Sequence, residues 1–431
     1  MKRLEWNLLT ASERAAVLRR PRMETDQQLQ QNVADILARV RAGGDQAVID
    51  YTRQFDDVAP ASLWQDSADH APLPADLDAA IDRAIATVSA FHARGKPQGY
   101  ALETAPGVVC ESRWVALDPV GLYVPAGTAP LPSTAIMLSV PARLAGCKQL
   151  VLATPPNQAG QADPAVLAVA AKLGISKVLI AGGAQAIAAM AWGTESVPNC
   201  VKLFGPGNRF VAEAKRQAAA DPDGAAQDLP AGPSEVMVVA DQHARADWVA
   251  MDLLSQAEHG PDSQVILVTD SSALAEAVQR AVETQLSTLP RREMAAKSLQ
   301  SAAILLVNDI NDMVDVCEQY APEHLIVNLA QAPRLTDQLR SAGSVFVGPY
   351  TPESLGDYVS GTNHTLPTGG WARAHSGLST LDFMRRMTLQ TASAAGLQSL
   401  GPAAARLARH EGLDAHRLAV EMRLDALENG Q

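Results

Sequence analysis

Gln256 and His259, in the second half of the chain, have the residue types and the spacing to bind one ion together. They lie near the end of residues 251–264, which read as a helix with an apolar face. Three positions apart on a helix, their side chains are about 60° apart and project together. An imidazole nitrogen and an amide oxygen suit zinc, and Gly260-Pro261 stops the helix where a pocket can open. Taken alone, the spacing describes equally well a surface glutamine and a capping histidine, which is the commoner arrangement.

Two further segments offer groups for proton transfer and for metal binding. Glu323 and His324 are adjacent on a loop just before a predicted strand, so they could divide the duties of a general acid and a general base. Asp357 follows Gly356 in a polar, turn-rich segment, and its carboxylate is a candidate oxygen ligand for a metal. The ordinary alternatives are a solvated glutamate, a histidine with satisfied hydrogen bonds and a turn-forming aspartate.

The segment H-E-G-L-D-A-H, from His410 to His416, looks like a metalloprotease motif but has the wrong spacing. Histidines six positions apart point roughly 240° from each other on a helix, whereas H-E-x-x-H places both ligands on one face. Gly412 also weakens such a helix. One of the two histidines remains a candidate ligand. The resulting thiol-free ligand set, which suits zinc, manganese or cobalt, would be Gln256, His259, Asp357 and His416.

Four glycine-rich loops are predicted to follow strands, which is where open α/β sheets bind ligands. They read V-P-A-G-T-A-P from Val124, A-G-G-A-Q from Ala181, F-G-P-G-N from Phe204 and A-G-P-S-E from Ala231. Glycine lets backbone amides approach a phosphate, and helix N-termini favour its charge. The dinucleotide fingerprint is absent in its usual form, because Phe210 stands where a third glycine would be. Alone, these loops are more simply explained as tight turns.

Composition indicates a globular protein that acts on small molecules. The 431 residues are 47% hydrophobic and 19% charged, and the formal net charge of −12 argues against nucleic acid or an anionic membrane as the main partner. The four cysteines are far apart in sequence and form no C-x-x-C pair, and the N-terminus lacks the apolar core of a signal peptide. We therefore expect a soluble protein of the reducing cytoplasm.

The predicted elements form two α/β series. The first hundred residues are mainly amphipathic helices, and residues 107–117 alternate as a strand with one face open to water. Strand-like and helix-like segments then alternate in one series up to residue 220 and in another from residue 236, which predicts parallel sheets. The glycine-rich loops fall into two groups, so two sheets fit better than one barrel. After residue 379 we expect helices without strands, in a tail too small for its own core.

Taken together, these segments resemble the histidinol dehydrogenase family, which performs the last two oxidations of histidine biosynthesis. The resemblance covers about residues 120–423, and the first hundred residues carry less distinctive signal. Phe210 stands where a tyrosine is common, a departure that we do not expect to alter the chemistry. The motifs that carry the resemblance occur in the family's order and are G-P-G-N-R-F-V, A-G-P-S-E, D-L-L-S-Q-A-E-H-G, A-P-E-H-L, G-D-Y-V-S-G-T-N-H-T-L-P-T, S-G-L-S-T and E-G-L-D-A-H.

The resemblance implies a role for each matching residue. Glu323 and His324 become the acid/base pair. The implied ligands of one zinc ion per subunit are Gln256, His259, Asp357 and His416, the last supplied by the partner subunit of a homodimer. The implied NAD contacts are Tyr123, Gln185 and Asn208. The implied substrate contacts are Ser234, His364 and Glu411, together with His324 and the four zinc ligands.

The implied fold is two Rossmann-like parallel-sheet domains with small helical extensions at both ends. We expect an N-terminal extension over residues 1–21 and a first domain, with the metal and acid/base residues, over residues 22–122 and 236–378. The second domain, with the NAD loops, would cover residues 123–235. Residues 379–431 would form a helical tail that packs on the partner subunit.

The resulting hypothesis is a zinc-containing, NAD-dependent dehydrogenase that converts L-histidinol to L-histidinal and then to L-histidine. One alternative is a relative on the same scaffold that oxidises another primary alcohol, such as a sulfonated diol. A second alternative, from another class, is a zinc hydrolase in which Glu323 activates water and the glycine loops bind no nucleotide. NADH formation with each alcohol would distinguish the three.

Overall fold

The computed structural model describes residues 1–20, 27–58, 60–126, 129–230 and 232–430. They divide into unit 1, made of Met1–Arg94 and Asp118–Thr380, and unit 2, made of Gly95–Leu117 and Leu381–Gln431. Residues 127–128 of the first glycine-rich loop and residue 231 of the last lie outside the described residues.

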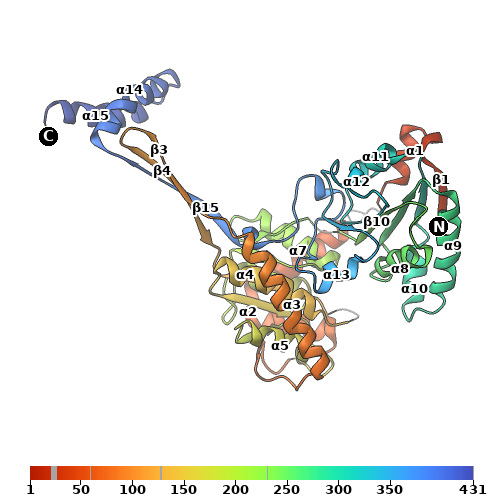
Figure 1. The fold of residues 1–431 in the computed structure, drawn as a ribbon. Helices are drawn as coiled ribbons and strands as arrows, with labels where there is room; N and C mark the ends of the chain where they lie inside the picture. The colour runs from red at the N-terminus through yellow and green to blue at the C-terminus, as the bar shows by residue number, and fades with distance from the viewer. Residues whose placement is uncertain (21–26, 59, 127–128, 231, 431) are drawn as a thin grey trace. The chain divides into compact units, whose positions relative to one another are not determined.

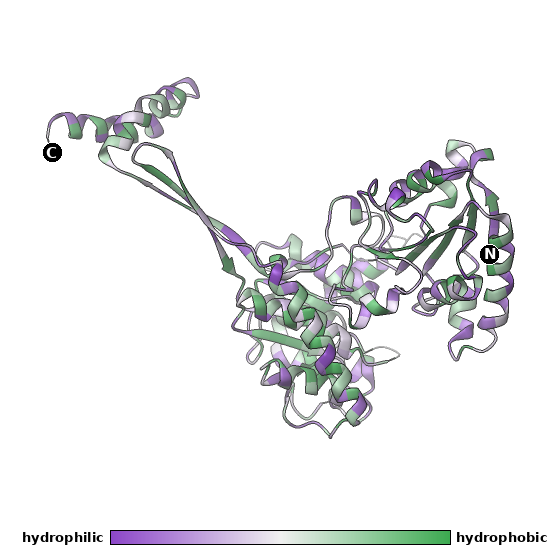
Figure 2. Ribbon diagram, viewed as in Figure 1, coloured by the Kyte–Doolittle hydropathy of each residue, from purple (hydrophilic) through white to green (hydrophobic). Residues whose placement is uncertain are grey.

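Unit 1 contains two six-stranded sheets, of which sheet A is entirely parallel. Its central strands are runs of valine, isoleucine and leucine that are buried on both faces, as a covered parallel sheet requires. Figure 2 shows these strands in the colours of apolar residues. In spatial order, the strands are β1 (Lys2–Glu5), β12 (Ala303–Leu306), β11 (Gln264–Thr269), β10 (Glu235–Ala240), β13 (His324–Asn328) and β14 (Ser344–Val347).

Helices cover both faces of sheet A. Successive strand residues point to opposite sides, so each strand contacts helices on both faces. Val236 and Val238 pack with α8, α9 and α10, while Met237 and Val239 pack with α11 and α12. The helices of this half are α1 (Ala11–Val17), α8 (Ala246–Ala257), α9 (Ser272–Leu286), α10 (Arg292–Ser298), α11 (Ile310–Tyr320), α12 (Pro333–Thr336) and α13 (Glu353–Tyr358). The short 3-10 helices are η1 (Trp6–Leu8), η2 (Trp371–Arg373) and η3 (Thr380–Phe383).

Sheet B is parallel except for its edge strand β2, which pairs antiparallel with β7. In spatial order, its strands are β2 (Trp64–Asp66), β7 (Lys177–Ile180), β6 (Leu150–Thr154), β5 (Val120–Tyr123), β8 (Lys202–Phe204) and β9 (Ala226–Gln227). Its helices are α2 (Gln27–Asp56), α3 (Ala75–Arg94), α4 (Pro132–Ala145), α5 (Pro164–Lys172), α6 (Gly183–Trp192) and α7 (Arg209–Ala220). The expected pair of α/β sheets is therefore confirmed.

The predicted domain boundaries are wrong for the N-terminal third. Helix α2, which is kinked at Gly44, packs its apolar face on α6 and α7, and α3 packs on α4. Helices α2 and α3 thus complete the core of sheet B rather than that of sheet A. Strand β1, expected in a separate extension, instead joins sheet A beside β12. Amphipathic periodicity predicts that a helix buries a face, but it does not say against which sheet.

Unit 2 is an antiparallel sheet followed by two helices. Strands β3 (Tyr100–Ala105), β4 (Val108–Ala116) and β15 (Met384–Ala392) lie in the order β15-β4-β3, followed in sequence by α14 (Ala394–His410) and α15 (Asp414–Glu428). The expectation of helices alone after residue 379 is wrong, because β15 pairs with β4 along nine residues. Its side chains are mostly exposed, so backbone hydrogen bonds rather than a buried face hold it.

Membrane-spanning helices are absent from the part of the chain that the structure describes, since none of its helices combines the length and the apolar composition that a bilayer requires.

Candidate active site

The predicted acid/base pair lies at the amino end of sheet A. His324 is the first residue of β13 and Glu323 precedes it, and the neighbouring strands β10, β11 and β14 also begin here. The pair precedes a strand, as expected from the sequence, and the A-G-P-S-E motif stands between β9 and β10 in the sequence. Both side chains are buried, with exposed fractions of 6% for Glu323 and 3% for His324.

The backbone of Glu235 holds both members of the pair. Its N–H donates to Glu323 Oε2 at 2.8 Å, and its carbonyl oxygen lies 3.1 Å from His324 Nδ1. A protonated Nδ1 donates to that carbonyl, and Nε2 lies 3.4 Å from Asp357 Oδ1. The Glu235 carboxylate is itself fixed by Arg20 at 2.5 and 2.8 Å and by the Gly369 N–H at 2.6 Å. The buried Glu235 carboxylate thus has its hydrogen bonds satisfied, and the backbone of the same residue holds Glu323 and His324.

The turn that leads into the pair adopts a rare backbone conformation. Ala321 ends α11 with φ of +52°, a region that favours glycine, and its N–H donates to Cys317 O at 2.7 Å. Such conformations cost of order 1–3 kcal/mol and persist where the surroundings impose them. The residues after Ala321 are held by the segment that contains Gly343. The Gly343 N–H donates to the Pro322 carbonyl at 2.9 Å, and Gly343 also lies close to the Glu323 backbone.

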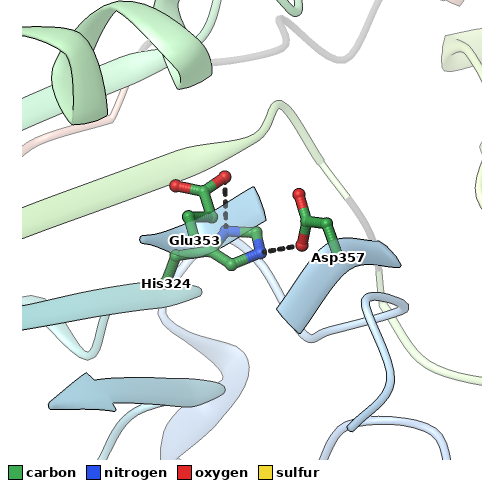
Figure 3. Close-up of side chains that lie close together, drawn as sticks. All are labelled: His324, Glu353 and Asp357. Atoms are coloured by element: carbon green, nitrogen blue, oxygen red, sulfur yellow. Dashed lines mark ion pairs between the residues drawn. The ribbon is translucent and has the colours of Figure 1, made fainter. Parts of the chain in front are cut away.

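Helix α13 brings two carboxylates to His324. Glu353 and Asp357 are four positions apart and therefore share one helical face, as Figure 3 shows. Asp357 Oδ1 lies 3.4 Å from His324 Nε2, and Glu353 Oε1 lies 3.8 Å from His324 Nδ1. The helix approaches this closely because Gly356 has no side chain, since a Cβ there would lie 2.4 Å from the Phe346 ring.

Gln256 and His259 come together at the end of α8, although only Gln256 lies within the helix. The helix ends at Ala257, and His259 occupies the turn that follows. The consistent orientation of the buried Gln256 amide directs its NH₂ to the Glu353 carboxylate and its oxygen to His259 Nδ1 at 3.1 Å. Glu353 therefore fixes which end of the amide faces the site.

Burial and neighbouring charges set the protonation of this group. Burial opposes a charge on His324, but the carboxylates of Glu353 and Glu323 outweigh it and raise the pKa of His324 well above its ordinary value. Burial raises the pKa of Glu323, and it raises that of Glu353 to about 8. Burial also disfavours charge on Asp357, yet the His324 ring holds the pKa of that carboxyl below its usual range.

Glu353, Glu235 and Arg20 are functional candidates that the sequence did not single out. The ligand atoms of His324, Glu353 and Asp357 all lie within 4.8 Å of one another. The spacing of Glu353 four residues before Asp357 was an available signal. No local signal marks Arg20, because its partner Glu235 is 215 positions away in the sequence.

The remaining substrate candidates divide between the two units. Ser234 directly precedes β10, and its carbonyl accepts from the Gln264 N–H at 3.1 Å. His364 is half-buried, with Nδ1 2.9 Å from the Asp357 carbonyl oxygen and Nε2 3.2 Å from Thr134 Oγ1. Glu411 and His416 belong to unit 2, where both are exposed and Gly412 separates their helices with φ of +72°.

The predicted NAD contacts lie at the carboxyl end of sheet B. Tyr123 ends β5, Gln185 is in the first turn of α6, and Asn208 caps α7 by accepting from the Phe210 and Val211 N–H groups. Tyr123 is buried, and its hydroxyl accepts from the Gly183 N–H at 3.1 Å. Gln185 Oε1 is buried without a hydrogen-bond partner among the described residues. Such an atom at a helix N-terminus fits a polar ligand.

The model of the histidinol dehydrogenase family matches residues 18–424. The chain belongs to this family. It is 51% identical to a histidinol dehydrogenase of Xanthomonas campestris over 98% of this chain and 99% of the relative, and 49% identical to one of Idiomarina loihiensis over 98% and 96%. The crystal structure of histidinol dehydrogenase from Elizabethkingia anophelis superposes with a TM-score of 0.94 at 40% identity and covers 99% of both chains.

Membership of the histidinol dehydrogenase family makes the chain an NAD-dependent oxidoreductase. The donor atoms suit a metal: the buried Gln256 oxygen faces His259 Nδ1, and the ligand atoms of His324, Glu353 and Asp357 lie within 4.8 Å of one another. This set is free of thiolate among the described residues of the site and suits zinc, manganese or cobalt. At the other sheet, the buried Gln185 Oε1, which has no hydrogen-bond partner among the described residues, fits a polar ligand such as a nucleotide.

Proposed function

We propose that this chain oxidises L-histidinol to L-histidine through L-histidinal, with one NAD⁺ reduced in each step. The observation that carries the proposal is the buried Glu323–His324 pair beside Gln256 and Asp357, in a chain 51% identical to a histidinol dehydrogenase over nearly its whole length. The relatives described above are all named for histidinol. They give no support to the sulfonated-diol or hydrolase alternatives.

His324 is suited to move the proton in both oxidations. An alcohol that loses a hydride must also lose its hydroxyl proton, so a base is needed within hydrogen-bond reach. Nδ1 lies against the Glu235 carbonyl, so Nε2, which has Asp357 Oδ1 at 3.4 Å, is the nitrogen that would exchange the proton with substrate. The carboxylates of Glu353 and Glu323 then stabilise the imidazolium. NAD, when bound, supplies the hydride acceptor.

Glu323 is suited to the hydration that separates the two oxidations. An aldehyde has no second hydride to give until water has added to its carbonyl carbon. Burial raises the pKa of Glu323, which makes the carboxylate a stronger base toward that water. The Glu235 N–H holds one carboxylate oxygen and leaves the other for the water. The expected division of labour therefore has a geometric basis.

We also propose that Gln256, His259 and Asp357, with His416 of the partner subunit, hold one zinc ion. Zinc would supply a template that orients the amine and imidazole nitrogens of the substrate. Ser234, His364 and Glu411 are proposed to contact substrate, and Tyr123, Gln185 and Asn208 to contact NAD. The cytoplasmic location stays a prediction from the sequence.

The homodimer is proposed from the surface of unit 2. Helix α15 buries none of its residues, and α14 buries only Gly396, Gly401 and Ala405. Leu407 and Met422 have exposed fractions of 64% and 68%, and Leu400, Leu413 and Leu418 are also exposed. An apolar surface of this kind favours burial against a second protein surface. A second copy of the chain would also supply Glu411 and His416 to the site.

The test of the activity is NADH formation by the purified protein with L-histidinol, with a sulfonated diol and without substrate. We expect two NADH per L-histidinol consumed, with L-histidine as the final product. A product ratio of one NADH per substrate, or NADH formation with the diol alone, would contradict the proposed reaction.

Removal of the metal is expected to abolish the activity. Dialysis against a chelator should reduce L-histidinol oxidation to background, and added zinc, manganese or cobalt should restore it, because an oxygen and nitrogen ligand set tolerates all three. The measurement pairs metal content with turnover in the same samples. Full turnover in protein shown to be metal-free would contradict the template role.

A further inference from the structure

A buried ion pair in sheet B holds the peptide at the start of the loop that carries Asn208. Lys215 lies in the second turn of α7 and Asp228 follows β9, and their side chains form an ion pair with exposed fractions of 5% and 2%. Lys215 Nζ also donates to the Gly205 carbonyl oxygen at 3.0 Å, and the Gly205 N–H donates to Asp228 Oδ2 at 2.8 Å. Both polar groups of Gly205 are thus bound by one pair of side chains.

The backbone of Gly205 adopts a conformation that suits glycine and leaves no room for a side chain. Its φ is +118°, a conformation that L side chains rarely adopt, and a Cβ would lie 2.1 Å from the Tyr123 carbonyl oxygen. Two residues later, a Cβ on Gly207 would lie 2.4 Å from Val211. The loop therefore runs in close contact with the end of β5 and the first turn of α7, where a small rotation of one peptide would displace Asn208.

The energetics favour a positioning role over a purely stabilising one. Removing two charges from water carries a desolvation cost that their attraction only partly offsets, and well-packed apolar residues are often as stable. An ion pair whose side chains also bind the N–H and the carbonyl of Gly205 can fix the orientation of that residue's backbone, which an apolar pair cannot do. By contrast, Lys172 pairs at the surface with the carboxylates of Asp78 and Asp82.

We propose that Lys215 and Asp228 are positioning residues for the NAD loop formed by residues 205–208. The proposal rests on the proposed NAD contact of Asn208. Loss of the pair frees the Gly205 peptide, lowers the affinity for NAD and NADH, and leaves the histidinol side of the site in sheet A unchanged.

The test compares Lys215→Met and the double variant Lys215→Met/Asp228→Asn with the wild type and with Lys172→Met. The double variant contains no unpaired buried charge, so it keeps the experiment valid if the single variant does not fold. NADH affinity is measured by fluorescence titration, the KM for each substrate by steady-state kinetics, and stability by denaturant unfolding. We expect at least a tenfold weaker NADH affinity and a correspondingly higher KM for NAD, with the KM for histidinol at saturating NAD within twofold of wild type. Lys172→Met should match the wild type.

Failure of the positioning role of Lys215 and Asp228 and failure of the proposed function give different results. A folded variant whose NADH affinity stays within twofold of wild type overturns the positioning role, whatever its stability. Equal increases in the KM for NAD and for histidinol also overturn it, because they indicate general disorder. Asn208→Ser keeps a good helix cap but removes the amide. If it leaves NADH affinity unchanged, or if the wild type binds no NADH, the NAD assignment itself is wrong.

Discussion

Glu323→Gln is expected to lower the oxidation of L-histidinal by about 10²-fold or more and to affect the oxidation of L-histidinol far less. Only the aldehyde must gain water, and an amide is too weak a base to activate it. The substitution preserves the site otherwise, because the Gln oxygen can still accept from the Glu235 N–H that now binds Oε2 at 2.8 Å. His324→Ala should lower both oxidations by a similar factor, since a proton leaves oxygen in each.

The measurement is the rate of NADH formation with each substrate supplied separately, at saturating NAD. Glu293→Gln, at an exposed glutamate in the first turn of α10, is the matched control and should leave both rates unchanged. Equal losses from Glu323→Gln with the two substrates would show that this carboxylate serves proton transfer generally. In that case the separate hydration role would be wrong.

The sheets of unit 1 could be predicted because the sequences of their central strands are runs of apolar residues. Strands such as V-I-L-V in β11 bury every residue, so hydrophobicity alone marks them. Strand β15 could not be recognised in this way. It reads M-R-R-M-T-L-Q-T-A and exposes most of its side chains, and its order comes from nine residues of pairing with β4. Pairing with a distant strand leaves no periodic signal when neither face is buried.

The assignment of the N-terminal helices failed for a related reason. Helix α2 has a clear apolar face, and its residues Val33, Leu37 and Val40 are buried as their spacing predicts. The same face would suit either α/β sheet, because both present apolar helices and strands. The choice of sheet B depends on shape, including the kink at Gly44, and shape is a property of the assembled core.

The site was predicted where chemistry is local in sequence and missed where it is not. The pairs Gln256 with His259, and Glu323 with His324, are near neighbours, and the structure places each pair together. Glu353 acts on Gln256 across 97 positions, and Arg20 reaches Glu235 across 215, so no spacing rule connects them. The rule that ligands lie beyond the carboxyl ends of strands does not point to Glu323 and His324, which lie at the amino end of β13.

The other large expected effect is the recovery of activity when two inactive variants are mixed. His259→Ala and His416→Ala should each be inactive as homodimers, because each site in either dimer lacks one proposed ligand. In a mixed dimer, one site collects both lesions and the other collects none, provided that His416 serves the partner's site. Random reassortment makes about half of the dimers mixed with one intact site in two, so roughly a quarter of the wild-type activity should return.

His410→Ala is the matched control for this experiment, since His410 is also exposed and lies six positions before His416 at the end of α14. It should be active by itself, and its mixture with His259→Ala should show no gain beyond the sum of the two. Co-refolding followed by NADH formation with L-histidinol gives the readout. If all four ligands came from one chain, every site in every dimer of the two inactive variants would carry one lesion. The mixture would then recover nothing, and the tail of unit 2 would have to complete the site of its own subunit.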